Sequence, residues 1–290
     1  MALVGIAAMD IITRFAPSPT GPLHLGNAYA AWFAWNAAQE AGGQFLLRIE
    51  DLDQGRARPE FEAAILDDLR WLGLNWHGPI IRQSNRSAVY QSALDDLSAC
   101  GLTYPCFCTR RDIADEIANA GAAPHGPDGP IYPGTCRTIP QTEADARIQD
   151  GEAYAVRLNI AAAIKQTGAI QWREDGAKIS ANPQQFGDIV LSRKDAPAAY
   201  HLAVVIDDAA SGVTLVTRGS DLKAATDIQV LLQHLFHLPV LAYRHHRLVL
   251  GADGARLAKR EKSASIAERR KSGESPEAVL EAAKQLLGPN

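Results

Sequence analysis

The chain has 290 residues, of which 47% are hydrophobic and 21% are charged, and its formal net charge at neutral pH is −4. This length is where a single hydrophobic core begins to divide, and the composition is that of a globular protein, not a disordered or fibrous one. The acidic balance argues against a protein that coats nucleic acid through bulk positive charge, so any nucleic-acid site must be local.

Two features favour a reducing compartment. The cysteines Cys100, Cys106, Cys108 and Cys136 all fall in one central stretch, which is a poor layout for disulfides that span a fold. The opening segment MALVGIAAM has no basic residues, and its apolar run is too short to cross a bilayer. We expect a cytoplasmic monomer with no membrane partner.

The first hundred residues alternate between strand and helix patterns. Residues 10–15 predict a short strand, and a loop rich in Gly and Pro follows it. An Ala-rich helix is expected from about Leu25 to Gly42, then a strand over 44–51 and a helix that begins at Pro59. This order predicts the opening of a nucleotide-binding α/β sheet.

The pattern changes at residue 101. Residues 101–182 hold the cysteines and a stretch rich in Gly and Pro, and the α/β pattern resumes over 186–238. We therefore predict an α/β, Rossmann-type core with halves at 1–100 and 183–240, split by a cysteine-containing insertion at 101–182. Residues 241–290 are expected to form a hairpin over 246–260, with its turn at Asp253-Gly254, and a charged helical tail.

Residues 14–27, RFAPSPTGPLHLGN, resemble the HIGH signature of the class I aminoacyl-tRNA synthetases, and the flanking residues resemble the glutamyl group of that family. The resemblance implies an ATP-dependent ligase, in which His24, Gly26 and Asn27 bind ATP and His24 is catalytic. A loop that leads from a strand into a helix N-terminus favours phosphate binding. Asn27 replaces the second histidine of the signature, which keeps a hydrogen-bond donor but not a titratable group.

Residues 256–260, RLAKR, resemble the second signature, KMSKS. Lys259 is implied to bind the ATP phosphates, with magnesium, and to be catalytic through its charge. Arg256 replaces the first lysine and Ala258 the usual serine, so the charge is kept and one hydroxyl is lost. Taken alone, this run reads as a solvated basic hairpin tip, but its pairing with the first signature favours function.

The resemblance also implies a pocket for L-glutamate. Its matching residues are Arg14, Ala16, Ser18, Glu50, Tyr200 and Arg218. The two arginines would hold the side-chain carboxylate, Glu50 would face the ammonium group, and Tyr200 would line the pocket. Asp207 and Asp208 also match the family, but their chemistry alone implies only a role in the fold.

Cys106, Cys108 and Cys136 suggest a structural zinc site, which needs a fourth ligand. The spacing alone allows Cys100 or His125. Since Cys100 continues an apolar helical pattern, we expect it to be a small core residue. Resemblance to the glutamyl-queuosine branch of the family instead implies Tyr132. The alternative is a set of reduced cysteines without metal.

The chain ends soon after Lys259, which leaves no room for the anticodon-reading domain of a glutamyl-tRNA synthetase. The resemblance is therefore to the truncated branch, which activates glutamate without tRNA and transfers it to queuosine at the wobble position of tRNA(Asp), held by its anticodon arm. Residues 101–182 are expected to contribute to acceptor binding. Two alternatives stay open: a truncated glutamyl-tRNA synthetase that charges a tRNA 3′ end, and a non-catalytic regulatory protein that binds glutamate and ATP.

Overall fold

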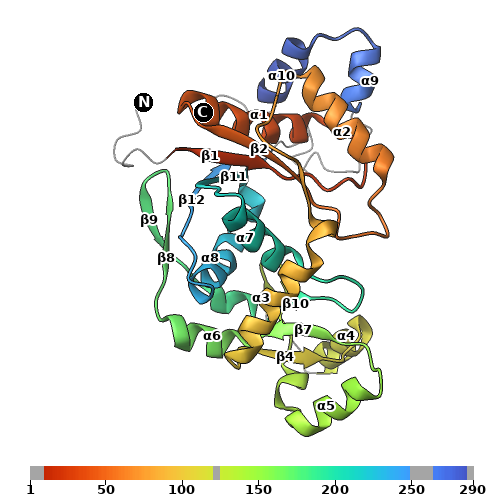
Figure 1. Ribbon diagram of the computed structural model, residues 1–290, viewed down its shortest axis with the longest axis vertical. Helices are drawn as coiled ribbons and strands as arrows, with labels where there is room; N and C mark the ends of the chain where they lie inside the picture. The colour runs from red at the N-terminus through yellow and green to blue at the C-terminus, as the bar shows by residue number, and fades with distance from the viewer. Residues whose placement is uncertain (1–9, 120–124, 249–263, 286–290) are drawn as a thin grey trace.

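The structure is a computed structural model and describes residues 10–119, 125–248 and 264–285 (Figure 1). The strands are β1 (Ile12–Phe15), β2 (Gln44–Ile49), β3 (Ile81–Arg82), β4 (Thr103–Cys106), β5 (His125–Gly126), β6 (Gly129–Pro130), β7 (Ala155–Leu158), β8 (Gln171–Glu174), β9 (Ala177–Ser180), β10 (Val190–Ser192), β11 (Leu215–Gly219) and β12 (Ala242–His246). The helices are α1 (Leu25–Glu40), α2 (Pro59–Trp71), α3 (Ser87–Ala99), α4 (Arg110–Asn119), α5 (Gln141–Gln149), α6 (Ile160–Thr167), α7 (Tyr200–Ala210), α8 (Ala225–Leu235), α9 (Ile266–Lys271) and α10 (Pro276–Gln285). Short 3-10 turns lie at Gln83–Arg86, Thr135–Thr138, Pro183–Phe186 and Ser220–Leu222.

Parallel strands form the centre of the molecule. β1 pairs with β2 and β2 with β3, while β11 pairs with β12 and β12 with β8. β1 and β11 lie side by side, because the Thr214 N–H donates to the Ile12 carbonyl at 2.9 Å and Arg14 reaches the Thr217 carbonyl at 3.2 Å. From this junction the strand order continues in opposite directions, through β2 to β3 on one side and through β12 to β8 on the other. In such sheets a ligand binds at the carboxyl ends of the strands, where the strand order reverses.

Helix α1 packs on this junction through small residues. Ala28, Ala31 and Ala34 are buried, and the Thr13 hydroxyl donates to the Ala34 carbonyl at 2.8 Å. The alanines allow the helix to lie close to the sheet, because they add little bulk between the two backbones. The predicted α/β class is confirmed.

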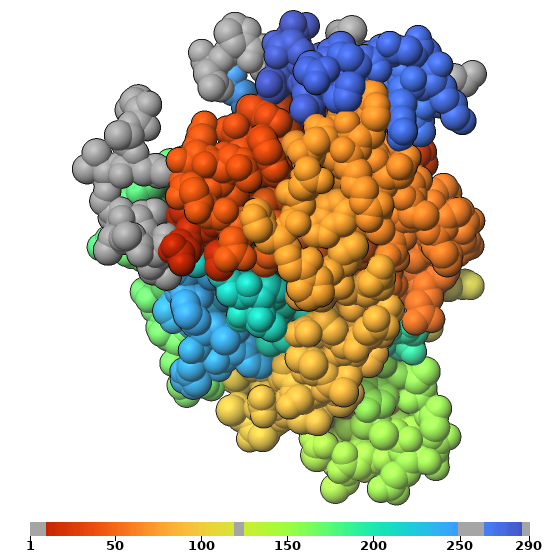
Figure 2. Space-filling view, turned by 45° about the horizontal axis from the view of Figure 1, so that its top comes forward, coloured from red at the N-terminus to blue at the C-terminus, as the bar shows by residue number. Residues whose placement is uncertain are grey.

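The charged tail forms α9 and α10, and these helices pack over α1 and α2 (Figure 2). Val279 and Ala283 of α10 are buried in the same cluster as α1, and Lys284 Nζ lies 4.4 Å from the centroid of the Trp32 ring. The predicted helical tail is therefore part of the core that supports α1.

The middle of the chain shares its sheets with the core. β4 and β7 are antiparallel partners, and β7 also pairs with β10, while β8 joins the sheet of β11 and β12. Strands from residues 101–182 thus hydrogen-bond to β10 of residues 183–240 and to β12 of residues 241–290. The division of the chain at residues 101, 183 and 241 stays a prediction.

β12 is a parallel strand that ends at His246. The predicted turn at Asp253-Gly254 lies outside the described residues, as does most of the predicted hairpin. None of the helices that the structure describes combines the length and the apolar character needed to cross a bilayer.

Candidate active site

The first signature sits at the junction of β1 and α1. His24 is the N-cap residue of α1, and its N–H donates to Oδ1 of Asn27, the third helical residue, at 3.1 Å, as in a capping box. The His24 Nδ1 is buried and has no hydrogen-bond partner among the described residues. A Cβ on Gly26 would meet no atom of the described residues within 4 Å. An open helix N-terminus of this kind favours the binding of a phosphate group.

The second signature, including Lys259, lies outside the described residues. One of its described flanks reaches helix α1 and the other reaches the first signature itself. On one side, the His246 ring packs against two rings of α1, with 5.0 Å between its centroid and that of Tyr29 and 5.3 Å to that of Phe33. On the other side, the Ile266 N–H donates to the Leu23 carbonyl, beside His24, at 2.9 Å.

Arg14 is buried and held by an aspartate. Its Nε donates to Asp208 Oδ1 at 3.0 Å and its Nη1 to the Thr217 carbonyl at 3.2 Å. Asp208 also accepts from Arg48 Nη1 at 2.6 Å, and Arg48 Nη2 lies 3.2 Å from Glu50 Oε1. One buried ionic chain therefore joins β1, α7 and β2.

Glu50 follows β2 and lies against the first-signature loop, since its N–H donates to the Pro17 carbonyl at 3.0 Å. Burial raises the pKa of the Glu50 carboxyl, and Arg48 and Arg14 offset only part of that effect. A substrate ammonium group beside Glu50 would favour its ionised form.

Arg218 is also buried, at the carboxyl end of β11, with 6% of its surface exposed. It donates from Nη1 to Gln229 Oε1 at 2.7 Å, from Nη2 to Thr226 Oγ1 at 2.7 Å, and from Nε to His245 Nε2 at 3.2 Å. Burial lowers the pKa of His245 to about 4, so all three partners are neutral at neutral pH. No carboxylate lies within ion-pair distance of Arg218 in the part of the chain that the structure covers. A buried guanidinium is costly without a counter-charge, which a substrate carboxylate can supply.

The other predicted glutamate residues are placed nearby or at the surface. Ala16 is half-buried and Ser18 exposed in the loop after β1, beside the Pro17 carbonyl that binds the Glu50 N–H. Tyr200 is the first residue of α7 and remains 38% exposed. The structure thus gathers Arg14 and Glu50 into one network and places Arg218 on the adjacent strand.

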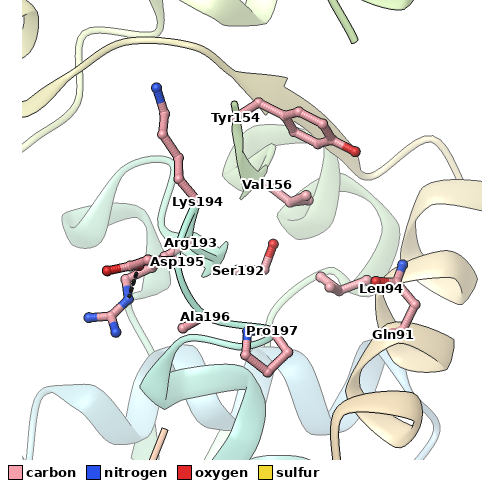
Figure 3. A pocket seen from close by; sticks show the side chains of 10 residues that line it. All are labelled: Gln91, Leu94, Tyr154, Val156, Ser192, Arg193, Lys194, Asp195, Ala196 and Pro197. Atoms are coloured by element: carbon pink, nitrogen blue, oxygen red, sulfur yellow. Dashed lines mark ion pairs between the residues drawn. The ribbon is translucent and has the colours of Figure 1, made fainter. Parts of the chain in front are cut away.

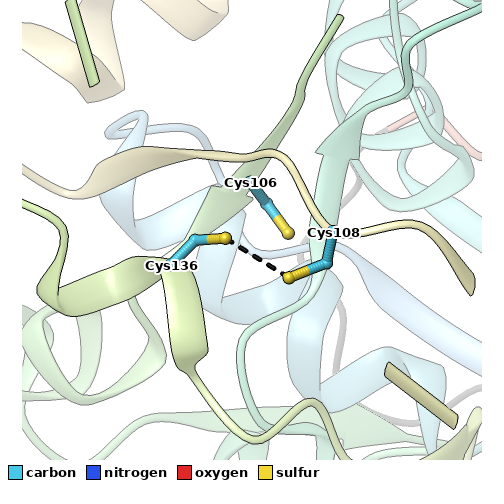
Figure 4. A group of neighbouring side chains, drawn as sticks. All are labelled: Cys106, Cys108 and Cys136. Carbon is cyan, nitrogen blue, oxygen red and sulfur yellow. Dashed lines mark hydrogen bonds between the residues drawn. The ribbon is translucent and has the colours of Figure 1, made fainter. Parts of the chain in front are cut away.

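The cysteine cluster is formed as predicted (Figure 4). The sulfur atoms of Cys106, Cys108 and Cys136 all lie within 4.8 Å of one another, and Cys108 and Cys136 are 3.4 Å apart. The Tyr132 hydroxyl is 3.5 Å from both Cys106 and Cys108, and it accepts the Cys136 N–H at 2.9 Å. The guanidinium of Arg157 lies 3.8 Å from the centroid of the Tyr132 ring. Three soft sulfur donors and one phenolic oxygen suit a tetrahedral zinc ion.

The thiols differ in their ease of ionisation. Burial raises the pKa of Cys108 to about 11. Burial acts in the same direction on Cys136, but hydrogen bonds from Tyr132 and Cys108 outweigh it and lower its pKa.

The prediction that Cys100 is a core residue is wrong. Leu94 and Leu97 are buried, but Cys100 caps the C-terminus of α3 and is exposed. The helical pattern ends with α3 at Ala99, so the apolar face does not extend to the next residue. His125 is also exposed, on β5, and neither residue belongs to the thiol cluster.

Two hollows open near this cluster. One, of about 380 Å³, lies between α3, β7 and the loop after β10, with Lys194 and Tyr154 on one side and Gln91 on the other (Figure 3). In its wall, Arg193 and Asp195 form an ion pair of 3.3 Å. The second, of about 550 Å³, adjoins Cys108 and Cys136 and shares Lys194. Neither is lined by a described residue of the predicted glutamate and nucleotide sites.

The sequence interpretation missed several residues around the arginines. Arg48 could have been found, because it lies near the end of β2, two positions before Glu50, and residues two apart in an extended chain face the same side. Asp208 was assigned to the fold alone, whereas it binds Arg14 directly. His245 gave no signal in the sequence, because its contact with Arg218 depends on which strands are neighbours.

Comparison with known proteins identifies the family. The model for tRNA synthetases class I (E and Q), catalytic domain, matches residues 10–288. A relative from Rhodobacter capsulatus named glutamyl-Q tRNA(Asp) synthetase is 48% identical over 96% of this chain and 100% of its own length. A relative of the same name from Nocardia farcinica is 45% identical over 95% of this chain and 84% of its own length.

Among solved structures, a glutamate tRNA ligase from Elizabethkingia meningosepticum in complex with its amino acid matches with a TM-score of 0.72 and 27% identity. The match covers 92% of this chain and 54% of the ligase chain, so this chain spans about half the length of that enzyme. The chain belongs to the class I tRNA synthetase family (E and Q), among relatives named glutamyl-Q tRNA(Asp) synthetase.

Proposed function

We propose that this chain activates L-glutamate with ATP and transfers the glutamyl group to queuosine at the wobble position of tRNA(Asp). The observation that carries the amino-acid part is the buried Arg218, whose described partners are all neutral. The names of relatives at 48% and 45% identity support the choice of acceptor.

The reaction has two steps. A carboxylate oxygen of glutamate attacks the α-phosphorus of ATP, and pyrophosphate leaves. His24, the N-terminus of α1 and Lys259 stabilise the negative charge that develops on the phosphates, with magnesium. A hydroxyl of the queuosine diol then attacks the carbonyl carbon of the adenylate, and AMP leaves. Arg14 and Arg218 hold the side-chain carboxylate, Glu50 faces the ammonium group, and Ala16, Ser18, Tyr200, Gly26 and Asn27 complete the two substrate sites.

Zinc is proposed for the thiol cluster, with Cys106, Cys108, Cys136 and Tyr132 as ligands. The burial of Cys106 and Cys136 and the approach of the Tyr132 hydroxyl support this set. Bound zinc would link β4 to the segment that begins at Thr135 and so stabilise the fold.

The test separates the acceptor from the activation step. Radiolabelled glutamate is offered with queuosine-containing tRNA(Asp), with the same tRNA lacking its terminal adenosine, and with unmodified tRNA(Asp). We expect label on the first two and none on the third, since a site that hydrogen-bonds a diol strongly rejects a base without one. Label that requires the terminal adenosine and persists on unmodified tRNA would identify a truncated glutamyl-tRNA synthetase. Absence of glutamate-dependent pyrophosphate exchange would identify a non-catalytic binding protein.

A further inference from the structure

Arg218 is connected to a second layer of buried polar residues. β11 and β12 pair so that Arg218 and His245 are neighbours. His245 Nδ1 lies 2.6 Å from Glu174 Oε1, on β8, and Glu174 Oε2 accepts from Lys223 Nζ at 2.5 Å. Successive contacts therefore connect Lys223 to Glu174, Glu174 to His245, and His245 to Arg218.

The chemistry of these groups fixes where the imidazole proton resides. A carboxylate only accepts hydrogen bonds, so Nδ1 of His245 carries the proton and donates it to Glu174. The unprotonated Nε2 then accepts from Arg218 Nε. The opposite tautomer would place two donors face to face at Arg218 and two acceptors at Glu174.

A count of hydrogen bonds shows which donors of Arg218 the described residues use. A guanidinium has five N–H groups, and the bonds to His245, Thr226 and Gln229 use one on each nitrogen. One N–H on each terminal nitrogen has no acceptor among the described residues, and such a pair can bind the two oxygens of a carboxylate.

We infer that His245, oriented by Glu174, is a positioning residue that holds Arg218 ready for the substrate carboxylate. This inference rests on the proposed function, because it assumes that Arg218 binds glutamate.

The surroundings of His245 support this role. Its side chain is 2% exposed. The Tyr243 ring lies parallel to it, with 6.3 Å between centroids, and the Trp172 ring lies 5.9 Å away at a steep angle. These rings leave the imidazole little freedom to turn, so the acceptor that it presents to Arg218 is fixed in direction.

The first test measures KM for glutamate and for ATP separately in pyrophosphate exchange. His245→Phe keeps an aromatic ring but removes the acceptor, and it should raise the KM for glutamate about tenfold, as expected for one lost hydrogen bond to a charged group. The KM for ATP should change by less than about twofold. His245→Gln can present an amide oxygen near the place of Nε2 and should recover most of the affinity.

A matched control lies beside these residues, between Arg244 on β12 and Asp175 in the turn after β8. Arg244 and Asp175 form an ion pair of 2.7 Å, one residue along from His245 and Glu174, with Asp175 58% exposed. Arg244→Ala should leave both KM values unchanged. It also provides the reference for thermal melting, which verifies that the His245 variants are folded.

A double-mutant cycle tests the role of Glu174. Glu174→Gln alone should raise the KM for glutamate about threefold, and it should add nothing in the His245→Phe background, because it acts only through His245. Additive effects would show that Glu174 does not act through His245 and would overturn the inference. If His245→Phe does not fold, Glu174→Gln alone decides the point, because a wild-type KM for glutamate in that folded variant would overturn the inference.

Failure of the inference is distinct from failure of the function. If wild-type protein gives no glutamate-dependent exchange, the proposed function is wrong. If Arg218→Ala weakens glutamate use while folded His245→Phe keeps the wild-type KM, the function stands and the positioning role is rejected.

Discussion

Asp208 Oδ1 accepts a hydrogen bond from Arg14 Nε at 3.0 Å, and both side chains are buried. The same oxygen accepts from Arg48 at 2.6 Å, so one carboxylate balances two guanidinium groups. Asp208→Asn keeps the shape and removes the charge. We expect the free energy of unfolding to fall by about 3 to 5 kcal/mol, because a buried cation is left without its partner. Urea denaturation measures this change.

The control for this variant is Asp195→Asn. Asp195 pairs with Arg193 but is 79% exposed. Its loss should change the free energy of unfolding by no more than about 0.5 kcal/mol. Equal effects of the two substitutions would contradict a stabilising role for the buried pair.

Acid should weaken the same interaction. Burial raises the pKa of Asp208, but Arg14 and Arg48 outweigh it and hold the pKa below its ordinary value. Its stabilising effect is therefore complete above the pKa of the unfolded chain and is lost as the pH falls through the lower folded value. Denaturation between pH 7 and pH 3 should show wild type losing its advantage over Asp208→Asn below about pH 4.

The comparison between wild type and variant is needed because protonation of other buried carboxyls stabilises the folded state. Burial raises the pKa of Asp68 to about 6 and also raises that of Glu50. Acidification relieves the cost of keeping these groups ionised in the folded state. A constant difference between wild type and Asp208→Asn across this pH range would refute the assignment.

Substitution of Arg218 tests the glutamate pocket. Arg218→Ala should weaken glutamate use by on the order of 2 to 5 kcal/mol, since it removes a buried partner of a charged group. Pyrophosphate exchange at varied glutamate measures the effect, and aspartate and glutamine should not support exchange. Arg56→Ala is the control, because the Arg56 side chain is 66% exposed and pairs only with its neighbour Asp53 among the described ion pairs. Full activity in Arg218→Ala would show that the pocket is misplaced.

Metal content tests the thiol cluster. Protein purified without added metal should contain one zinc per chain, and the double variant Cys106→Ser, Cys108→Ser should contain none, because harder hydroxyl ligands replace two soft thiolates. Elemental analysis measures both. Cys100→Ser should retain the ion, since Cys100 is exposed and outside the cluster. Undiminished zinc in Tyr132→Phe would keep the site but reject the phenolic ligand.

The sequence predicted those features that depend on neighbouring residues. The β1 strand, the loop and α1 follow from hydrophobic pattern, Gly and Pro placement, and helix propensity over residues 12–40. The thiol cluster was also predictable, because two of its cysteines are almost adjacent and cysteine is one of the few residue types that bind zinc.

Contacts between distant strands could not be predicted in this way. The junction of β1 with β11 depends on the whole path of the chain, and so does the placement of Glu174 beside His245. The error at Cys100 has a local cause: helical periodicity does not state where a helix stops, and α3 ends one residue earlier.

The hydrogen bond from Ile266 to Leu23 can form only after most of the chain has been synthesised. A ribosome synthesises β1, α1 and β2 early, β11 much later, and α9 and α10 at the end. Until α10 is made, the part of α1 that packs against it is uncovered, and such exposed surface favours aggregation of the nascent chain. The proposed nucleotide site should therefore be complete only near the end of translation, and an mRNA that stops before the codon for Ile266 should yield no active fragment.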